Sequence, residues 1–77
     1  MADPIPTEIG DVLILHNNSI PTHAVGTIAE AGQQTLKTNM SHERGRAAAE
    51  ARARTLAMPG RRIYIKNTDT GAWAELD

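Results

Sequence analysis

The sequence predicts one small α+β domain, an antiparallel sheet of four to five strands with a single helix, at about residues 41–58, packed on one face. The chain has 77 residues, which suits one domain. Only the Ala- and Arg-rich segment within 41–58 has the composition of a long helix, whereas residues 61–67 alternate between apolar and polar side chains as a strand does. The expected order is two strands, a possible third strand, the helix and two more strands. Residues 1–10 are expected to form an irregular arm in front of a single domain over 11–77.

The N-terminal arm is expected to be irregular because Pro4 and Pro6 block regular backbone structure. Its apolar residues, Ile5 and Ile9, are expected to pin it to the domain. The first strand is predicted at residues 12–15, a continuous apolar run whose length and branched side chains favour a strand over a helix.

A second strand is predicted at residues 22–29, after a turn rich in Asn, Ser and Pro at residues 17–21. Within this strand, Gly26 marks a bulge or a close approach of another backbone. The Ala-Gly dipeptide at 31–32 predicts a turn, after which residues 33–38 form the possible third strand.

The predicted helix begins at Ser41, which is expected to cap it by accepting a hydrogen bond from a backbone N–H of the first turn. It ends before Pro59-Gly60, since proline has no N–H to donate and glycine suits a turn. At about 100° per residue, one stripe of the helix consists mostly of small residues, namely Gly45, Ala49, Ala53, Leu56 and Ala57. The helix can therefore approach the sheet closely, and the large side chains of the core must come from the strands.

Four arginines on the predicted helix raise the question of nucleic-acid recognition. They are Arg44, Arg46, Arg52 and Arg54. A helix that reads DNA gathers its basic residues on one side, whereas these spread around the helix. Their distribution favours a solvated helix surface over a recognition helix.

The last two strands are predicted to form a hairpin over residues 61–67 and 72–76, joined by a four-residue loop at 68–71. This loop length fixes the cross-strand pairs as Ile63 with Leu76, Tyr64 with Glu75, Ile65 with Ala74, and Lys66 with Trp73. The isoleucines then face the helix, and the two aromatic residues lie on the opposite face of the sheet.

From the second strand onward, three features follow one another: the pair Ala24-Val25, the Ala-rich helix segment 47–57, and a closing hairpin with an Asp-Thr-Gly turn within 63–71. In this layout, roughly the last three quarters of the chain resembles a family of short bacterial proteins of unknown function. The chain departs from the family pattern at His23, where an aromatic residue is expected before the Ala-Val pair. The resemblance implies the α+β fold and no activity, so it transfers no functional residue.

The composition favours self-association. The core must be aliphatic, because the chain has no Phe, one Trp and one Tyr, and no disulfide is available, because it has no Cys. A chain of this length is marginally stable alone, and a partner subunit is the most available source of further burial. We therefore expect a homo-oligomer, most simply a homodimer. The lack of a long apolar run and of a signal peptide predicts a cytoplasmic protein that does not contact a membrane.

No catalytic, cofactor-binding or metal site is predicted. The sequence contains no phosphate-binding loop, dinucleotide fingerprint or nucleophile elbow. The histidines are His16, His23 and His42, of which the first two can approach each other across the first hairpin, but no cysteine joins them and no His-x-x-x-His spacing exists. Asp69 is expected to accept hydrogen bonds in a turn rather than act as a catalytic acid. We therefore expect neither an enzyme nor a cofactor.

The favoured function is that of a non-enzymatic binding or assembly domain. Its candidate interface is the sheet face opposite the helix, which carries Arg62, Tyr64, Lys66 and Trp73. An exposed aromatic pair of this kind is typical of an interface. Trp73 has two further interpretations, since its ring would also be covered if it filled the core of a monomer or if the arm packed over it.

The alternative function is weak nucleic-acid binding through the same face. Arg61, Arg62 and Lys66 would contact phosphates while Tyr64 and Trp73 stacked on bases. The acidic ends of the chain and the lack of a recognisable RNP-like motif argue against this alternative. A small enzyme or ligand carrier ranks last, because no convergent set of polar residues is visible.

Overall fold

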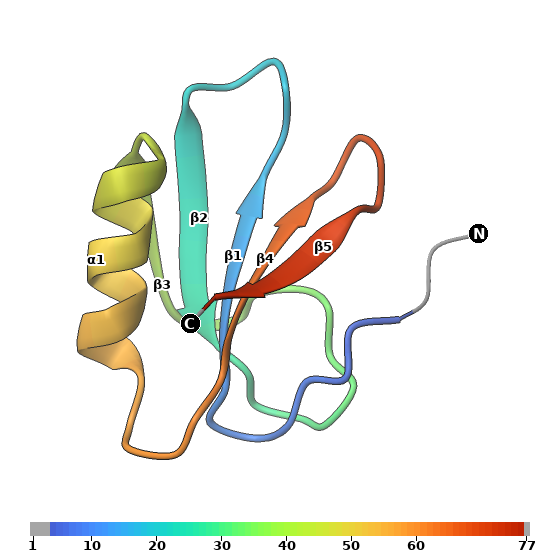
Figure 1. Cartoon of the computed structure of the whole chain (residues 1–77), viewed down its shortest axis with the longest axis vertical. Coiled ribbons are helices and arrows are strands. Elements are labelled where there is room, and N and C mark those ends of the chain that lie inside the picture. The colour runs from blue at the N-terminus through green and yellow to red at the C-terminus, as the bar shows by residue number, and fades with distance from the viewer. Residues whose placement is uncertain (1–3, 77) are drawn as a thin grey trace.

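Five strands form one mixed sheet, and a single helix packs against one face of it (Figure 1). The structure, a computed structural model, describes residues 4–76. The strands are β1 (Val12–His16), β2 (Thr22–Thr27), β3 (Thr38–Arg44), β4 (Ile63–Asn67) and β5 (Trp73–Leu76), and the helix is α1 (Arg46–Leu56). The α+β class predicted from the sequence is confirmed.

The strands lie in the order β3-β2-β1-β4-β5, so β1 is central and β3 and β5 are the edges. β1 and β4 run parallel, with Ile14 beside Ile65, while the other neighbours are antiparallel. The sequence predicted an antiparallel sheet throughout. The parallel pair arises because α1 carries the chain back from the end of β3, so that β4 starts at the same end of the sheet as β1 (Figure 1).

The third strand lies later in the chain than predicted. It occupies Thr38–Arg44 instead of residues 33–38, and it includes Ser41, which pairs with Val25 of β2. Gly26 lies where the register of β2 and β3 shifts, and a Cβ there would meet a carbonyl oxygen of β3 at 3.0 Å. The bulge and close approach predicted at Gly26 are therefore confirmed.

The helix is shorter than the predicted range of 41–58. Gly45 directly follows β3 and has a φ of 86°. Its backbone N–H donates to the carbonyl of Pro21 over 3.2 Å. α1 then begins at Arg46 with no side-chain cap, so the predicted capping role of Ser41 is wrong. The reason is that residues 41–44 form a ladder of backbone hydrogen bonds with β2, which the first turn of a helix could not provide.

Two apolar clusters lie on opposite faces of the sheet, because successive side chains of a strand point to opposite sides. The first core lies under α1 and contains Val12, Ile14, Val25, Ala49, Ala53, Ile63 and Ile65. The second core lies on the other face and contains Ile5, Leu13, Ile28, Leu36 and Tyr64.

The second core is covered by the arm and by the segment that joins β2 to β3. The hydroxyl of Thr7 donates to the backbone carbonyl of Gln33 over 2.7 Å, and the N–H of Gly32 donates to the carbonyl of Thr7 over 2.7 Å. Residues 4–10 therefore pack on the domain through specific hydrogen bonds, although they form no strand or helix.

The closing hairpin has the predicted register. The observed pairs are Ile63 with Leu76, Tyr64 with Glu75, Ile65 with Ala74, and Lys66 with Trp73. The loop is held by the Asn67 side-chain oxygen, which accepts from the backbone N–H groups of Asp69 and Thr70. Asp69 was predicted to be the acceptor within this turn, but it accepts from the N–H of Asn18 over 2.7 Å and so joins the two loops at this end of the sheet.

Candidate functional site

Tyr64, predicted to lie on an exposed interface, is buried. Its side chain is 1% exposed and belongs to the second core, and its hydroxyl donates to the carbonyl of Pro6 over 3.5 Å. The expectation of an exposed aromatic pair is therefore wrong. The physical reason is that residues 4–10 and 28–37, which contain little regular structure, cross this face and exclude water from the ring.

Trp73 occupies an intermediate position. Its ring packs against the second core and meets the ring of Tyr64 edge to face, with 5.7 Å between centroids and 75° between planes. The side chain remains half-buried. It therefore joins the core at one side and reaches the surface at the other.

The basic residues on and beside the predicted interface, Arg61, Arg62 and Lys66, each have a polar partner within the chain. A guanidinium nitrogen of Arg61 donates to a backbone carbonyl of the arm over 2.9 Å, and Arg62 lies 3.6 Å from the carboxylate of Glu75. The ammonium group of Lys66 donates to the side-chain oxygen of Gln34 over 3.0 Å. Lys66 faces Trp73 across the hairpin, but the ring of the only tyrosine is buried and is not exposed for stacking on bases.

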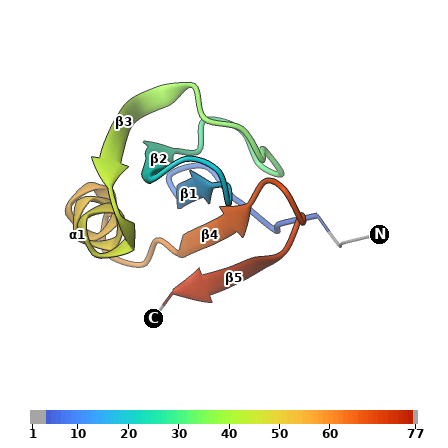
Figure 2. The ribbon, with the colours of Figure 1, turned by 90° about the horizontal axis from the view of Figure 1, so that it is seen from above.

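The helix covers only part of its side of the sheet. α1 packs against β1, β2 and β3, whereas β5 lies at the far edge (Figure 2). On the helix side of this edge, Ala72 and Ala74 are exposed, and Leu76 is half-buried because one side of it packs against the first core. We call these three residues the open half-face.

The sequence placed these apolar residues on the helix-covered face, and their exposure was missed. A helix is about 10 Å wide with its side chains, whereas five strands spaced about 4.8 Å apart span roughly 19 Å. One helix therefore cannot cover a five-stranded sheet. The sequence predicted four to five strands and a single helix. Comparing the width of one helix with that of the sheet would have predicted the open half-face.

A hollow of about 220 Å³ opens beside the open half-face, between the first turn of α1 and the last two strands. It is lined by His16, Arg46, Ile65, Asn67, Ala72, Trp73 and Ala74. Two of its polar groups are already engaged, since Arg46 donates to Glu50 over 2.9 Å and the Asn67 amide donates to Asn18 over 3.0 Å. The hollow therefore has an apolar floor and a polar rim, which suits an aliphatic side chain better than an anion.

His16 lines this hollow and stacks on His23, the residue opposite it across the first hairpin. The ring centroids are 4.9 Å apart and the planes differ by 16°. Burial, followed by the positive charges of His23 and Arg46, lowers the pKa of His16, and the carboxylate of Asp69 opposes this shift. The approach of the two histidines predicted from the sequence is confirmed, and within residues 4–76 no three His, Cys, Asp or Glu side chains gather as a metal site would require.

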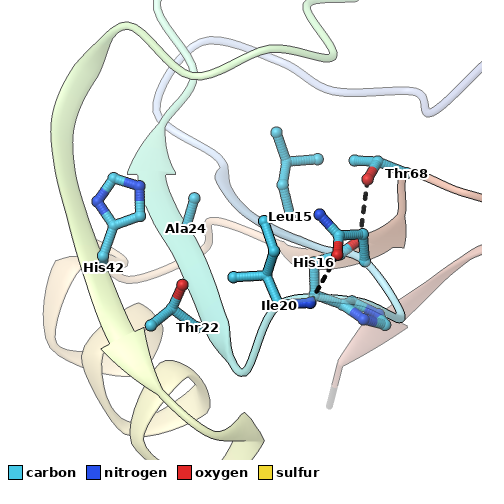
Figure 3. Close-up of a pocket in the computed structure, with 8 residues that line it drawn as sticks. Leu15, His16, Ile20, Thr22, Ala24, His42 and Thr68 are labelled. Atoms are coloured by element: carbon cyan, nitrogen blue, oxygen red, sulfur yellow. Dashed lines mark hydrogen bonds between the residues drawn. The ribbon is translucent and has the colours of Figure 1, made fainter.

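A second hollow, of about 180 Å³, lies on the opposite face beside the loop between β1 and β2 (Figure 3). Figure 3 shows Ile20 and His42 on either side of Ala24, while the hydroxyl of Thr68 donates to the carbonyl of His16 over 3.2 Å. Its walls combine three aliphatic residues with five polar ones, and its mouth is open to solvent. This arrangement resembles a contact surface more than a reaction site, because its lining does not combine an acid, a base and a nucleophile in one cluster.

Comparison with known proteins adds no family to this description: no family model, curated protein or solved structure matches the chain. The resemblance to short bacterial proteins of unknown function stays a prediction. Among residues 4–76, α1 is the only helix, and it is too short and too polar to cross a membrane.

Proposed function

We propose that this chain is a small non-enzymatic assembly domain that forms homo-oligomers, most simply a homodimer, by covering the open half-face with a second copy. The observation that carries the proposal is the exposure of Ala72 and Ala74 beside half-buried Leu76, on the side of the sheet where α1 does not reach. Small apolar residues on an edge strand allow a second backbone to approach closely. The predicted cytoplasmic location remains part of this proposal.

The two edges of the sheet differ in a way that favours β5 as the contact. β3 departs from a regular edge through the register shift against β2 and through Asn39, which has a φ of 54°. It also presents charged residues, Glu43 and Arg44. Bulges and charges are the devices by which proteins protect sheet edges from further pairing. β5 has no bulge and carries one charge within Trp73–Leu76, at Glu75.

Charge and size also support self-association. The formal net charge of −1 produces little repulsion between identical copies. A 77-residue chain without cysteine buries a limited share of its surface, so an added interface contributes a large fraction of its total stability.

The test is light scattering over a range of micromolar concentrations. We expect a mass of two chains that falls towards one on dilution. Ala74→Arg places a charge on the open half-face and is expected to give a monomer, whereas Ala51→Arg, at an exposed position on α1, keeps the wild-type behaviour. A mass of one chain that does not change with concentration would overturn the proposal.

A further inference from the structure

The edge strand β5 specifies how two copies would meet, and this step rests on the proposed self-association. Identical chains associate most often through a two-fold axis, so each residue of the contact faces a residue of the same surface. Two β5 strands related in this way run antiparallel and extend the sheet from one copy into the other. The helix side of one copy then continues into the helix side of the second copy.

This continuity restricts the register to a few choices. In a continuous sheet, residues that face each other across the contact must point to the same side. The two-fold axis must therefore lie midway between one residue and the same residue of the second copy. An axis beside Glu75 would place two carboxylates opposite each other, which is destabilising. An axis beside Trp73 would pair β5 with the hairpin loop at 68–71, and an axis beside Leu76 would place most of β5 opposite positions that lie outside the strand. An axis beside Ala74 matches the strand with itself and brings no like charges together.

The hydrogen-bonding pattern of the β5 backbone also favours a two-fold axis beside Ala74. The N–H of Asn67 donates to the carbonyl of Ala72 over 2.8 Å, so Asn67 and Ala72 occupy a hydrogen-bonded position of the β4–β5 ladder. Hydrogen-bonded and non-hydrogen-bonded pairs alternate along an antiparallel ladder. The backbone N–H and C=O of Ala74 therefore also point towards β4, whereas those of Glu75 point outward from the edge. Ala74 and its symmetry mate would then form a non-hydrogen-bonded pair, in which the side chains approach most closely and small residues fit best.

We propose that two copies pair through β5 with Ala74 opposite Ala74, and that the exposed part of Leu76 in each copy, whose other side packs against its own first core, enters the mouth of the hollow of the other. In this register Leu76 of the second copy lies opposite Ala72, on the helix side of the sheet and at the mouth of the hollow. The hollow holds about 220 Å³, has an apolar floor at Ile65, and is bounded by His16 and Arg46. Each copy therefore supplies the aliphatic side chain that the hollow of the other copy lacks.

Cysteine crosslinking tests this register directly, since the natural chain has no cysteine. In a non-hydrogen-bonded antiparallel pair the Cα atoms are about 4.5 Å apart, within the range that a disulfide spans. Under mild oxidation, the variant Ala74→Cys is expected to form a covalent dimer rapidly. The control Ala51→Cys, an equally simple substitution at an exposed site on α1, is expected to stay mostly monomeric.

A second experiment tests the entry of Leu76 into the hollow. Ala72→Cys and Leu76→Cys are prepared separately, mixed and oxidised, and the products are identified by mass spectrometry. We expect the mixed disulfide to exceed the disulfide of either variant with itself. If light scattering shows a dimer but Ala74→Cys crosslinks no faster than Ala51→Cys, the register is wrong while the proposed assembly stands. If light scattering shows only a monomer, both proposals fail.

Discussion

At the scale of single residues, Asp11 joins three parts of the chain through one buried carboxylate. Its side chain is 3% exposed. One oxygen accepts from the backbone N–H of Arg62 over 3.0 Å, and the other accepts from the N–H of Glu8 over 2.9 Å. Its backbone carbonyl accepts from the N–H of Ile28 over 2.8 Å. The arm, the start of β4 and the end of β2 are thus held by a residue to which the sequence assigned no role.

Replacing Asp11 by Asn tests this role. An amide has one acceptor oxygen, so one backbone N–H would lose its partner and face an NH2 group instead. We expect the free energy of unfolding to fall by about 1–3 kcal/mol, the usual cost of leaving a buried polar group without a hydrogen bond. Urea denaturation measures the change. Glu30→Gln, at an exposed carboxylate in the loop after β2, serves as the control, and equal effects of the two changes would contradict this role of Asp11.

His16 predicts how stability depends on pH. Its pKa is lowered in the folded chain, mainly by burial and then by the charges of His23 and Arg46, so the unfolded chain binds the proton more readily. The contribution of His16 to stability is therefore complete above the ordinary value of 6.5 and is lost as the pH falls below it. We expect the urea midpoint to decrease between about pH 8 and about pH 5.

The matched variants are His16→Asn and His42→Asn. The first removes the stacked ring beside Arg46, and we expect it to flatten the decrease in the urea midpoint. The second changes an exposed histidine of β3 on the opposite side of the sheet, and we expect the decrease to persist. A decrease that survives in His16→Asn with unchanged slope would show that other groups cause it.

At the scale of elements, local patterns predicted four of the five strands well, and they predicted the third strand and the start of the helix poorly. Alternation and loop length were sufficient for the hairpin of β4 and β5, because its pairing partners are adjacent in sequence. Residues 41–44 have side chains that suit a first helical turn, and only their pairing with β2 makes them a strand. That pairing joins segments about twenty residues apart, so no local pattern contains it.

Gly45 sets the boundary between β3 and α1, and its substitution tests this. Its φ of 86° and ψ of 161° lie in a region that side chains with a Cβ rarely adopt, although a Cβ there would meet no atom within 4 Å. We therefore expect Gly45→Ala to lower the free energy of unfolding by about 1–3 kcal/mol through backbone strain alone. The loss is measured by urea denaturation. Ser19→Ala, at an exposed loop position, is expected to change little, and a neutral Gly45→Ala would contradict the strain argument.

At the scale of the whole molecule, one sheet supports two cores with different kinds of cover. The helix covers the first core, and this arrangement followed from the small-residue stripe with Ala49 and Ala53. The second core is covered by the arm and the segment from 28 to 37, whose contacts depend on tertiary packing and left no periodic signal in the sequence. For this reason the sequence placed Tyr64 on the surface, although it assigned the correct face of the sheet. The open half-face was missed for a related reason, since its exposure depends on how far α1 extends across the sheet.

The cover over the second core can be tested with two isoleucines of the arm. Ile5 is 1% exposed and packs in the core with Tyr64, whereas Ile9 is 65% exposed. We expect Ile5→Ala to lower the free energy of unfolding by about 2–4 kcal/mol, as the loss of a large buried side chain usually does. Ile9→Ala, the same substitution four positions along the arm, is expected to have little effect. The arm had been expected to be pinned by both residues, and the structure assigns that role to Ile5.

Fluorescence separates this loss from a general loosening of the fold, because Trp73 is the only tryptophan. Its ring contacts the second core and the ring of Tyr64, so water admitted by Ile5→Ala should shift its emission to longer wavelength in the folded protein. The circular dichroism of α1 should stay unchanged, since the helix packs on the other face. The comparison is made under conditions in which both variants are folded and monomeric. Equal emission from Ile5→Ala and Ile9→Ala would mean that the arm does not shield the aromatic pair.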